Sequence, residues 1–253
     1  MLFRSLESSL WDLEGILNPL LFMLIDGGIP LLPMETPYTT DHTFRVSKFI
    51  GARRTTDNKF VKQFENLFII LNESHQIIGW RLTTSTSFEE IRSLLQELKQ
   101  EIDVTRVIVD DCCKVRSLYQ SVFPDVEVKL DLFHAVQRVT KTIPKGTELS
   151  KKFSKEFGMI FRAREDSSEV RKMPTPHPEV MVENLENFVK RWQTFLNEDN
   201  MERTEIDHLR RHIRKGCLSD LNPGEGTESN ESLHHVSNRW IMVKVKVSPK
   251  SAN

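Results

Sequence analysis

Three acidic residues stand where the surrounding pattern could build a metal-binding site. Asp41 lies inside the strand-like stretch TTDHTF, and Asp110 ends the apolar run TRVIVD. Glu231 follows the glycine-rich turn NPGEGT, in the first turn of a short helix for which Thr227 is the expected N-cap. Sites in open α/β sheets gather at the carboxyl ends of strands, and Mg²⁺ favours carboxylate ligands. Two such ions can hold the attacking and leaving oxygens of a phosphodiester displacement.

Each acid also has a competitor or a simpler explanation. Asp111 directly follows Asp110, and Glu228 lies in the same turn as Glu231. Asp41 and Asp110 could instead be turn and edge residues. Glu231 could be a surface acid whose charge is favoured by the positive end of the helix dipole. The pattern of residues leaves these alternatives open.

Two adjacent cysteines, Cys112 and Cys113, come directly after the paired aspartates. The chain has three cysteines, and an odd count with an adjacent pair argues against a disulfide framework. A reducing compartment is therefore expected. We interpret the pair as small core residues at the start of a helix. Zinc is the alternative, although adjacent cysteines lack the usual two-residue spacing of zinc ligands.

The periodicity of the chain predicts the elements that must position these residues. A strand is expected near residues 39–51 and a hairpin over 64–83. Next comes a helix with a capping box, in which the Ser87 hydroxyl and the Glu90 carboxylate cap each other's backbone. Strands and helices then alternate, and they are expected at residues 105–110 (strand), 112–123 (helix), 126–131 (strand) and 132–143 (helix). This order predicts a mixed α/β sheet flanked by helices.

After residue 145 the pattern becomes purely helical, with helices expected over 147–164, 178–197 and 202–215. This predicts an all-α insertion before the helix that carries Glu231. The expected divisions are an N-terminal helix and linker (1–36), the first part of the core (37–145), the helical insertion (146–215), the completion of the core (216–238) and an irregular tail (239–253).

The bulk composition restricts the class of protein. The 253 residues carry a net charge of −1, so any nucleic-acid-binding surface must be local. Pro19 and Asp26 interrupt the apolar N-terminal stretch, and we expect no membrane span. Local positive charge could supply phosphate contacts, or could be a solvated helix face. The candidate DNA-binding residues are Arg138, Lys141, Arg210, Arg211, Arg214 and Lys215.

Four motifs in order resemble those of a eukaryotic DDE-type DNA transposase. They are TTDHTFR, VIVDDCCKVR, VKLDLFHAVQR and GCLSDLNPGEGTESNESLHH, and together they cover about residues 38–236. The resemblance implies an RNase H-like core in which Asp41, Asp110 and Glu231 hold two Mg²⁺ or Mn²⁺ ions. It also implies a structural pair of Cys113 with His134, DNA as the partner, a nuclear location and a homodimer.

The function implied by the resemblance is metal-dependent cleavage and transfer of DNA strands. The alternative is a catalytically inactive, transposase-derived module that binds DNA or protein. We expect the helix bearing Glu231 to end soon after Val236, and the N-terminus has no recognisable DNA-binding module. Both features favour a truncated or degenerate copy. A third hypothesis is an RNase H-like nuclease unrelated to transposition.

Overall fold

A computed structural model describes residues 38–43, 51–53, 57, 59–62, 64–85, 87–162, 173–196 and 201–235. The predicted N-terminal helix within 1–36 and the tail at 239–253 lie outside these residues. Contacts divide the chain into two compact units, which comprise 1–105, 117–126 and 228–253 in the first and 106–116 and 127–227 in the second. Among the described residues, no helix has the length and apolar character needed to cross a membrane.

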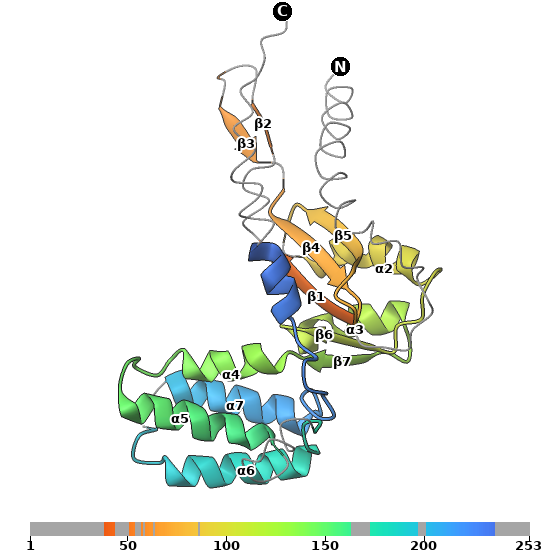
Figure 1. The fold of residues 1–253 in the computed structure, drawn as a ribbon. Coiled ribbons are helices and arrows are strands. Elements are labelled where there is room, and N and C mark those ends of the chain that lie inside the picture. The colour runs from red at the N-terminus through yellow and green to blue at the C-terminus, as the bar shows by residue number, and fades with distance from the viewer. Residues whose placement is uncertain are drawn as a thin grey trace, which may run out of the picture. The chain divides into compact units, whose positions relative to one another are not determined.

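The central feature is a five-stranded sheet whose strand order is β5-β4-β1-β6-β7 (Figure 1). Its strands are β1 (Tyr38–Thr43), β4 (Asn66–Leu71), β5 (Ile77–Thr83), β6 (Arg106–Val109) and β7 (Glu127–Leu130). β1 pairs antiparallel with β4, and β4 with β5, whereas β6 and β7 are parallel. Counted along the chain, this order is 3-2-1-4-5, which confirms the predicted RNase H-like mixed sheet. A separate antiparallel pair joins β2 (Gly51–Arg53) to β3 (Phe60–Lys62).

In the first unit, the β4–β5 hairpin supplies the core beside β1. Every residue of β4 is buried, as expected for a strand covered on both faces. Leu67, Ile69 and Leu71 alternate along the strand and form one cluster with Ile77. Leu233, from the helix over residues 228–235, packs against the same cluster. The alternation therefore determines which face of β4 receives that helix.

The helix after the hairpin begins differently from the predicted capping box. It starts as a 3₁₀ turn, η2 (Phe88–Ile91), and continues as α2 (Arg92–Leu98). The Ser87 hydroxyl accepts from the Glu89 amide, as a cap should. The Glu90 carboxylate, however, accepts from the Thr84 amide rather than from Ser87. The reciprocal half of the predicted box was wrong, because the Glu90 carboxylate accepts from Thr84 and the Ser87 amide donates to the Ser85 hydroxyl.

The second unit contains β6, β7, the start of α3 and the helices that follow β7. α3 (Cys112–Val122) begins three residues after the last residue of β6, and α4 (Leu132–Thr140) begins two residues after the last residue of β7. The Asp131 carboxylate caps α4 by accepting from the His134 amide.

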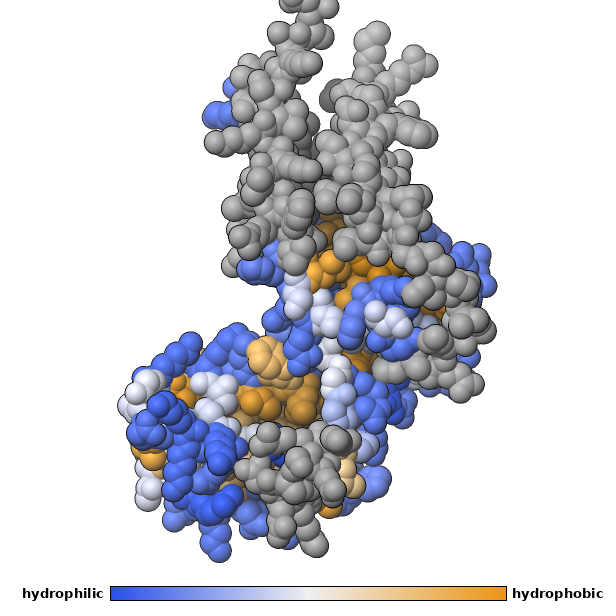
Figure 2. Space-filling view, in the orientation of Figure 1, coloured by the Kyte–Doolittle hydropathy of each residue, from blue (hydrophilic) through white to orange (hydrophobic). Residues whose placement is uncertain are grey.

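Further helices of this unit pack around an aromatic core. They are α5 (Glu148–Gly158), the 3₁₀ turn η3 (Met159–Phe161), α6 (Pro178–Arg191) and α7 (Met201–Arg214). The Phe153 ring lies 5.0 Å from both Phe188 and Trp192, edge to face in each case. Figure 2 shows mostly hydrophilic side chains on the visible face of this helical group, with a smaller hydrophobic area. Each helix therefore turns its apolar side inward.

Candidate functional site

The first predicted acid, Asp41, lies in the middle of β1 and is half-buried. Its Oδ1 accepts a hydrogen bond of 2.7 Å from the His42 amide. Its Oδ2 lies 3.2 Å from Nδ1 of His234. The imidazole of His42 packs against Phe68, with ring centres 4.7 Å apart, and burial lowers the pKa of this histidine. Hydrogen bonds and packing therefore hold the Asp41 carboxylate from two sides.

The helix over residues 228–235, drawn in dark blue in Figure 1, carries the third predicted acid. Asn230 is fully buried and accepts a 2.7 Å hydrogen bond from the Thr39 hydroxyl of β1. His234, one turn later, reaches Asp41. Glu231 is exposed and lies three residues before His234, so the two positions are neighbours on the helix surface. The first unit thus packs the helix of Glu231 against the strand of Asp41.

The second predicted acid, Asp110, directly follows β6 and is half-buried. Its Oδ1 lies 3.5 Å from Nε2 of His134, and its carbonyl accepts a 2.6 Å hydrogen bond from Arg138. The neighbouring Asp111 instead pairs with Lys114 at 3.0 Å and Arg138 at 3.2 Å. Burial opposes ionisation of Asp111, but Lys114 and Arg138 outweigh it and lower its pKa. The two adjacent aspartates therefore have different surroundings.

The buried carboxylate of Asp131 connects two parts of the second unit. Its Oδ1 caps α4 through the His134 amide. Its Oδ2 accepts from both the amide and the hydroxyl of Thr227, the hydroxyl at 2.8 Å. Thr227 immediately precedes the helix that carries Glu231, and its exposure is 1%. This carboxylate therefore holds Thr227, the last residue of the second unit.

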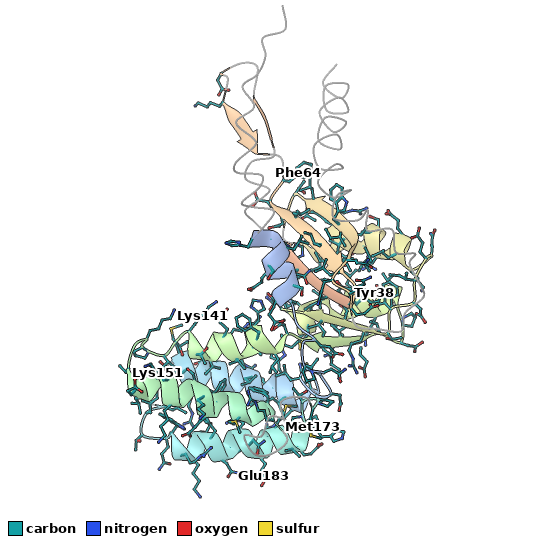
Figure 3. The ribbon with its side chains drawn as sticks, viewed as in Figure 1. Tyr38, Phe64, Lys141, Lys151, Met173 and Glu183 are labelled. Atoms are coloured by element: carbon teal, nitrogen blue, oxygen red, sulfur yellow. The ribbon has the colours of Figure 1, made fainter. Side chains whose placement is uncertain are left out.

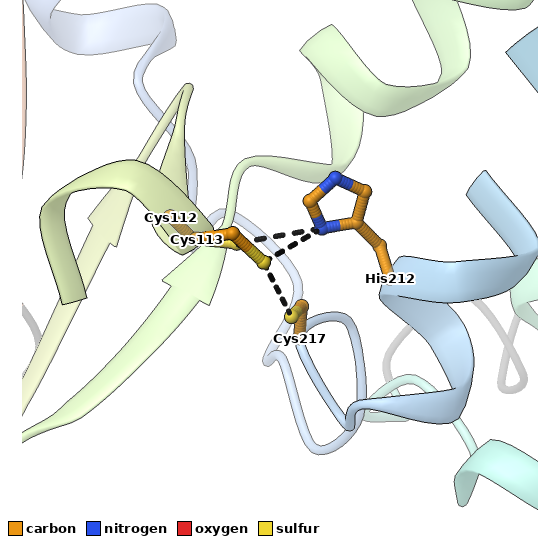
Figure 4. A group of neighbouring side chains, drawn as sticks. All are labelled: Cys112, Cys113, His212 and Cys217. Atoms are coloured by element: carbon orange, nitrogen blue, oxygen red, sulfur yellow. Dashed lines mark hydrogen bonds between the residues drawn. The ribbon is translucent and has the colours of Figure 1, made fainter. Parts of the chain in front are cut away.

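A cluster of three cysteines and one histidine lies within the second unit (Figure 4). The ligand-type atoms of Cys112, Cys113, His212 and Cys217 all lie within 4.8 Å of one another. Cys112 and Cys217 are buried, whereas Cys113 is exposed. Cys113 contacts the other three members of this cluster, and Nε2 of His134 lies 3.5 Å from Oδ1 of Asp110. The pairing of Cys113 with His134 stays a prediction.

His212 and Cys217 were not predicted from the sequence as members of one site. α7 ends in a Schellman motif, in which the Gly216 amide bonds to the Ile213 carbonyl and the Cys217 amide bonds to the His212 carbonyl. Gly216 has a φ of +68°, a conformation that glycine adopts without strain. The motif turns the chain back so that Cys217 comes beside His212. The sequence HIRKGC contains this signal, because a glycine after a basic helix end predicts such a cap.

The cluster has a positively charged neighbour. Nη2 of Arg116 lies 3.2 Å from Sγ of Cys217 and also donates to the Val128 carbonyl. The pKa of Cys217 lies well below that of an ordinary thiol, because Cys112 hydrogen-bonds to it and His212 and Arg116 favour its negative charge. The Leu130 amide donates to the Cys217 carbonyl at 2.8 Å, which holds this turn against the end of β7.

A basic pocket of about 400 Å³ opens beside the cluster. The side chains that line it are Asp111, Cys113, Lys114, Arg138, His208, Arg211, His212 and Lys215. Of the six predicted DNA-binding residues, this pocket brings together Arg138, Arg211 and Lys215. A surface of this charge suits phosphate groups.

The other three predicted DNA-binding residues lie elsewhere. Lys141 is exposed just after α4 (Figure 3), and Arg214 is exposed in the last turn of α7. Arg210 instead pairs with Glu186 and Asp207, and its side chain is 18% exposed. The ion pair of Arg210 with Glu186 therefore joins α7 to α6.

Comparisons with known proteins add a distant similarity to a solved structure. No family model matches the sequence, and no curated protein matches it. Among solved structures, the chain is similar to the Drosophila P element transposase strand transfer complex, with a TM-score of 0.42 and 8% identity. The match covers 90% of this chain and 81% of that one. A similarity this low does not identify a function.

Proposed function

We propose that this chain is a transposase-derived catalytic domain of the DDE type, which cleaves DNA phosphodiesters and transfers the freed strands. Asp41, Asp110 and Glu231 are the proposed catalytic acids. The observation that carries the proposal is the contact of His234 with Asp41, because it docks the helix of Glu231 on the strand of Asp41. In the sheet order, β1 is followed by β6, the strand that Asp110 directly follows.

The donor groups fit hard divalent cations. Asp41 and Asp110 offer carboxylate oxygens from half-buried positions, and Mg²⁺ or Mn²⁺ binds such oxygens together with water and phosphate oxygens. Two bound ions would supply an activated water and would stabilise the leaving oxygen. His234 and His134 each contact one of the aspartates and would orient its carboxylate. Asp110 is the proposed ligand, and Asp111, which pairs with Lys114 and Arg138, is the alternative.

A nicking assay on supercoiled plasmid tests this proposal. Wild-type protein should nick DNA with Mn²⁺ and not with the chelator EDTA. Each of Asp41→Asn, Asp110→Asn and Glu231→Gln should reduce the rate by about 100-fold or more, because a missing acid removes an interaction required in the transition state.

Asp111→Asn and Glu228→Gln are matched controls, since each is an acid adjacent to the site that is not proposed to act. Both should nick within about threefold of wild type. Equal nicking by wild type and Asp110→Asn would contradict the proposal.

The basic pocket supports a second candidate function, a transposase-derived module that binds DNA without cleaving it. Fluorescence anisotropy with duplex DNA at increasing salt tests this. Replacing both Arg211 and Lys215 with Ala should reduce the magnitude of the slope of log K against the logarithm of the salt concentration by about 2. The control pair, Lys151 and Lys152 changed to Ala, removes two exposed charges from α5, outside the pocket. An unchanged slope in the first pair would exclude the pocket as the DNA-binding surface.

Nuclear location and a homodimer complete the proposal, since a protein that acts on chromosomal DNA ends would work in the nucleus and would pair two ends.

A further inference from the structure

We propose that Cys112, Cys113, His212 and Cys217 form a structural zinc site. The site is separate from the three proposed catalytic acids and does not depend on the proposed function. It comes from two segments of the second unit that are about 100 residues apart in sequence, the start of α3 and the end of α7 with its cap.

Four of the six distances between ligand atoms match the edges of a tetrahedron around zinc, and the other two are no longer than 4.8 Å. Sγ of Cys113 lies 3.9 Å from Sγ of Cys112 and 4.0 Å from Sγ of Cys217. Nδ1 of His212 lies 3.6 Å from the sulfurs of both Cys112 and Cys113. Zinc–sulfur bonds of about 2.3 Å and zinc–nitrogen bonds of about 2.0 Å at tetrahedral angles give sulfur–sulfur edges of about 3.8 Å and sulfur–nitrogen edges of about 3.5 Å. One ion at the centre could therefore reach all four atoms.

Hydrogen bonding among the four groups explains the arrangement less well. Nδ1 of His212 is equally distant from two sulfurs, at 3.6 Å each. A ring nitrogen is either one donor or one acceptor, and a thiol is a weak partner in both roles. A shared cation accounts for both contacts, because it binds the nitrogen and the two sulfurs at once.

The ligand types select the metal. Three thiolates and an imidazole in a tetrahedral arrangement suit zinc, whereas Mg²⁺ and Mn²⁺ favour oxygen. Four protein ligands leave no open position for water, which is the pattern of a structural site. The bound ion would leave the cluster with one net negative charge, and Arg116, 3.2 Å from Cys217, would balance it.

The site would tie the junction after β6 to the end of α7. Cys112 comes two residues after Asp110, and Cys217 is bonded to Leu130 at the end of β7. Zinc would therefore fix the start of α3 and the polypeptide that leads from α7 toward Thr227.

Metal analysis of the full chain tests the proposal directly. Protein purified under reducing conditions and dialysed against metal-free buffer should retain about one zinc ion per chain by atomic emission. After exchange with Co²⁺, it should show the visible bands of tetrahedral cobalt and a thiolate charge-transfer band. Protein that holds less than about 0.1 zinc per chain, even when refolded with added zinc, would overturn the proposal.

Variants identify the ligands. Cys113→Ser changes an exposed side chain, so the protein should still fold, and zinc loss to EDTA should be at least about tenfold faster. Its cobalt charge-transfer band should fall by about one third, because one of three thiolates is gone. His212→Ala should also lose zinc, whereas the control His208→Ala, one turn earlier on α7, should retain it. Wild-type zinc retention and cobalt spectra in both Cys113→Ser and His212→Ala would overturn the assignment, since both would then be dispensable.

Discussion

Replacing Asp131 with Ala should destabilise the protein strongly, because one buried carboxylate serves three donors. The side chain is fully buried. It accepts from the His134 amide at 2.9 Å and from the Thr227 hydroxyl at 2.8 Å, and it also accepts from the Thr227 amide. Alanine would remove the cap of α4 and leave two donors of Thr227 without an acceptor.

The magnitude follows from these contacts. Loss of a helix N-cap costs about 1 kcal/mol. Each of the two buried Thr227 donors left unsatisfied costs roughly 1 to 2 kcal/mol. Removing the cost of burying the carboxylate offsets part of this sum, so we expect Asp131→Ala to lower the free energy of unfolding by about 3 kcal/mol. Asp131→Asn keeps one acceptor oxygen but places an amide NH₂ group beside a donor. It should therefore lower the free energy of unfolding by about half as much as Asp131→Ala does.

Urea unfolding followed by circular dichroism measures the loss. With a slope of about 3 kcal/mol/M, the midpoint for Asp131→Ala should fall by about 1 M. Asp125→Ala is the control, because Asp125 is exposed in the turn between α3 and β7 and should change stability by less than about 0.5 kcal/mol. A midpoint for Asp131→Ala equal to that of the control would refute the reasoning.

Three further substitutions test the packing around the candidate sites by the same unfolding assay. Phe153→Ala should cost about 4 kcal/mol, because the ring is fully buried among aromatic side chains, whereas Leu149→Ala at a half-exposed position on the same helix should cost under about 1 kcal/mol. Asn230→Ala should cost about 2 kcal/mol, since the buried Thr39 hydroxyl loses its partner; no loss would contradict the docking of the helix on β1. Gly216→Ala should cost about 1 kcal/mol through its positive φ, and an unchanged midpoint would argue against the Schellman cap.

The sheet could be predicted because its signals are local. The hairpin of β4 and β5 follows from two apolar runs around a polar turn, and β6 from a short apolar run of the kind found in central strands. The cap of the next helix was predicted in part, because the Ser87 contact is local. Glu90 instead accepts from Thr84 in the preceding segment, and no spacing rule describes that contact.

The basic residues and the cysteine cluster could be predicted from the sequence less completely than the sheet. A run of basic residues predicts a basic helix but does not tell where each side chain points. Arg210 and Arg211 were therefore predicted alike, whereas in the structure Arg210 pairs with Glu186 on α6. The cysteine cluster depends on packing between segments about 100 residues apart. Only the HIRKGC sequence gave a local signal, because its glycine predicts the turn that brings Cys217 beside His212.

Binding of Mn²⁺, measured by electron paramagnetic resonance in the presence of duplex DNA, tests most directly whether the three acids converge on divalent cations. Wild-type protein should bind Mn²⁺, and each of Asp41→Asn, Asp110→Asn and Glu231→Gln should weaken binding by about tenfold or more, since a charged ligand is lost. Asp111→Asn should bind as wild type does. Unchanged Mn²⁺ affinity in all three of the first variants would contradict the account.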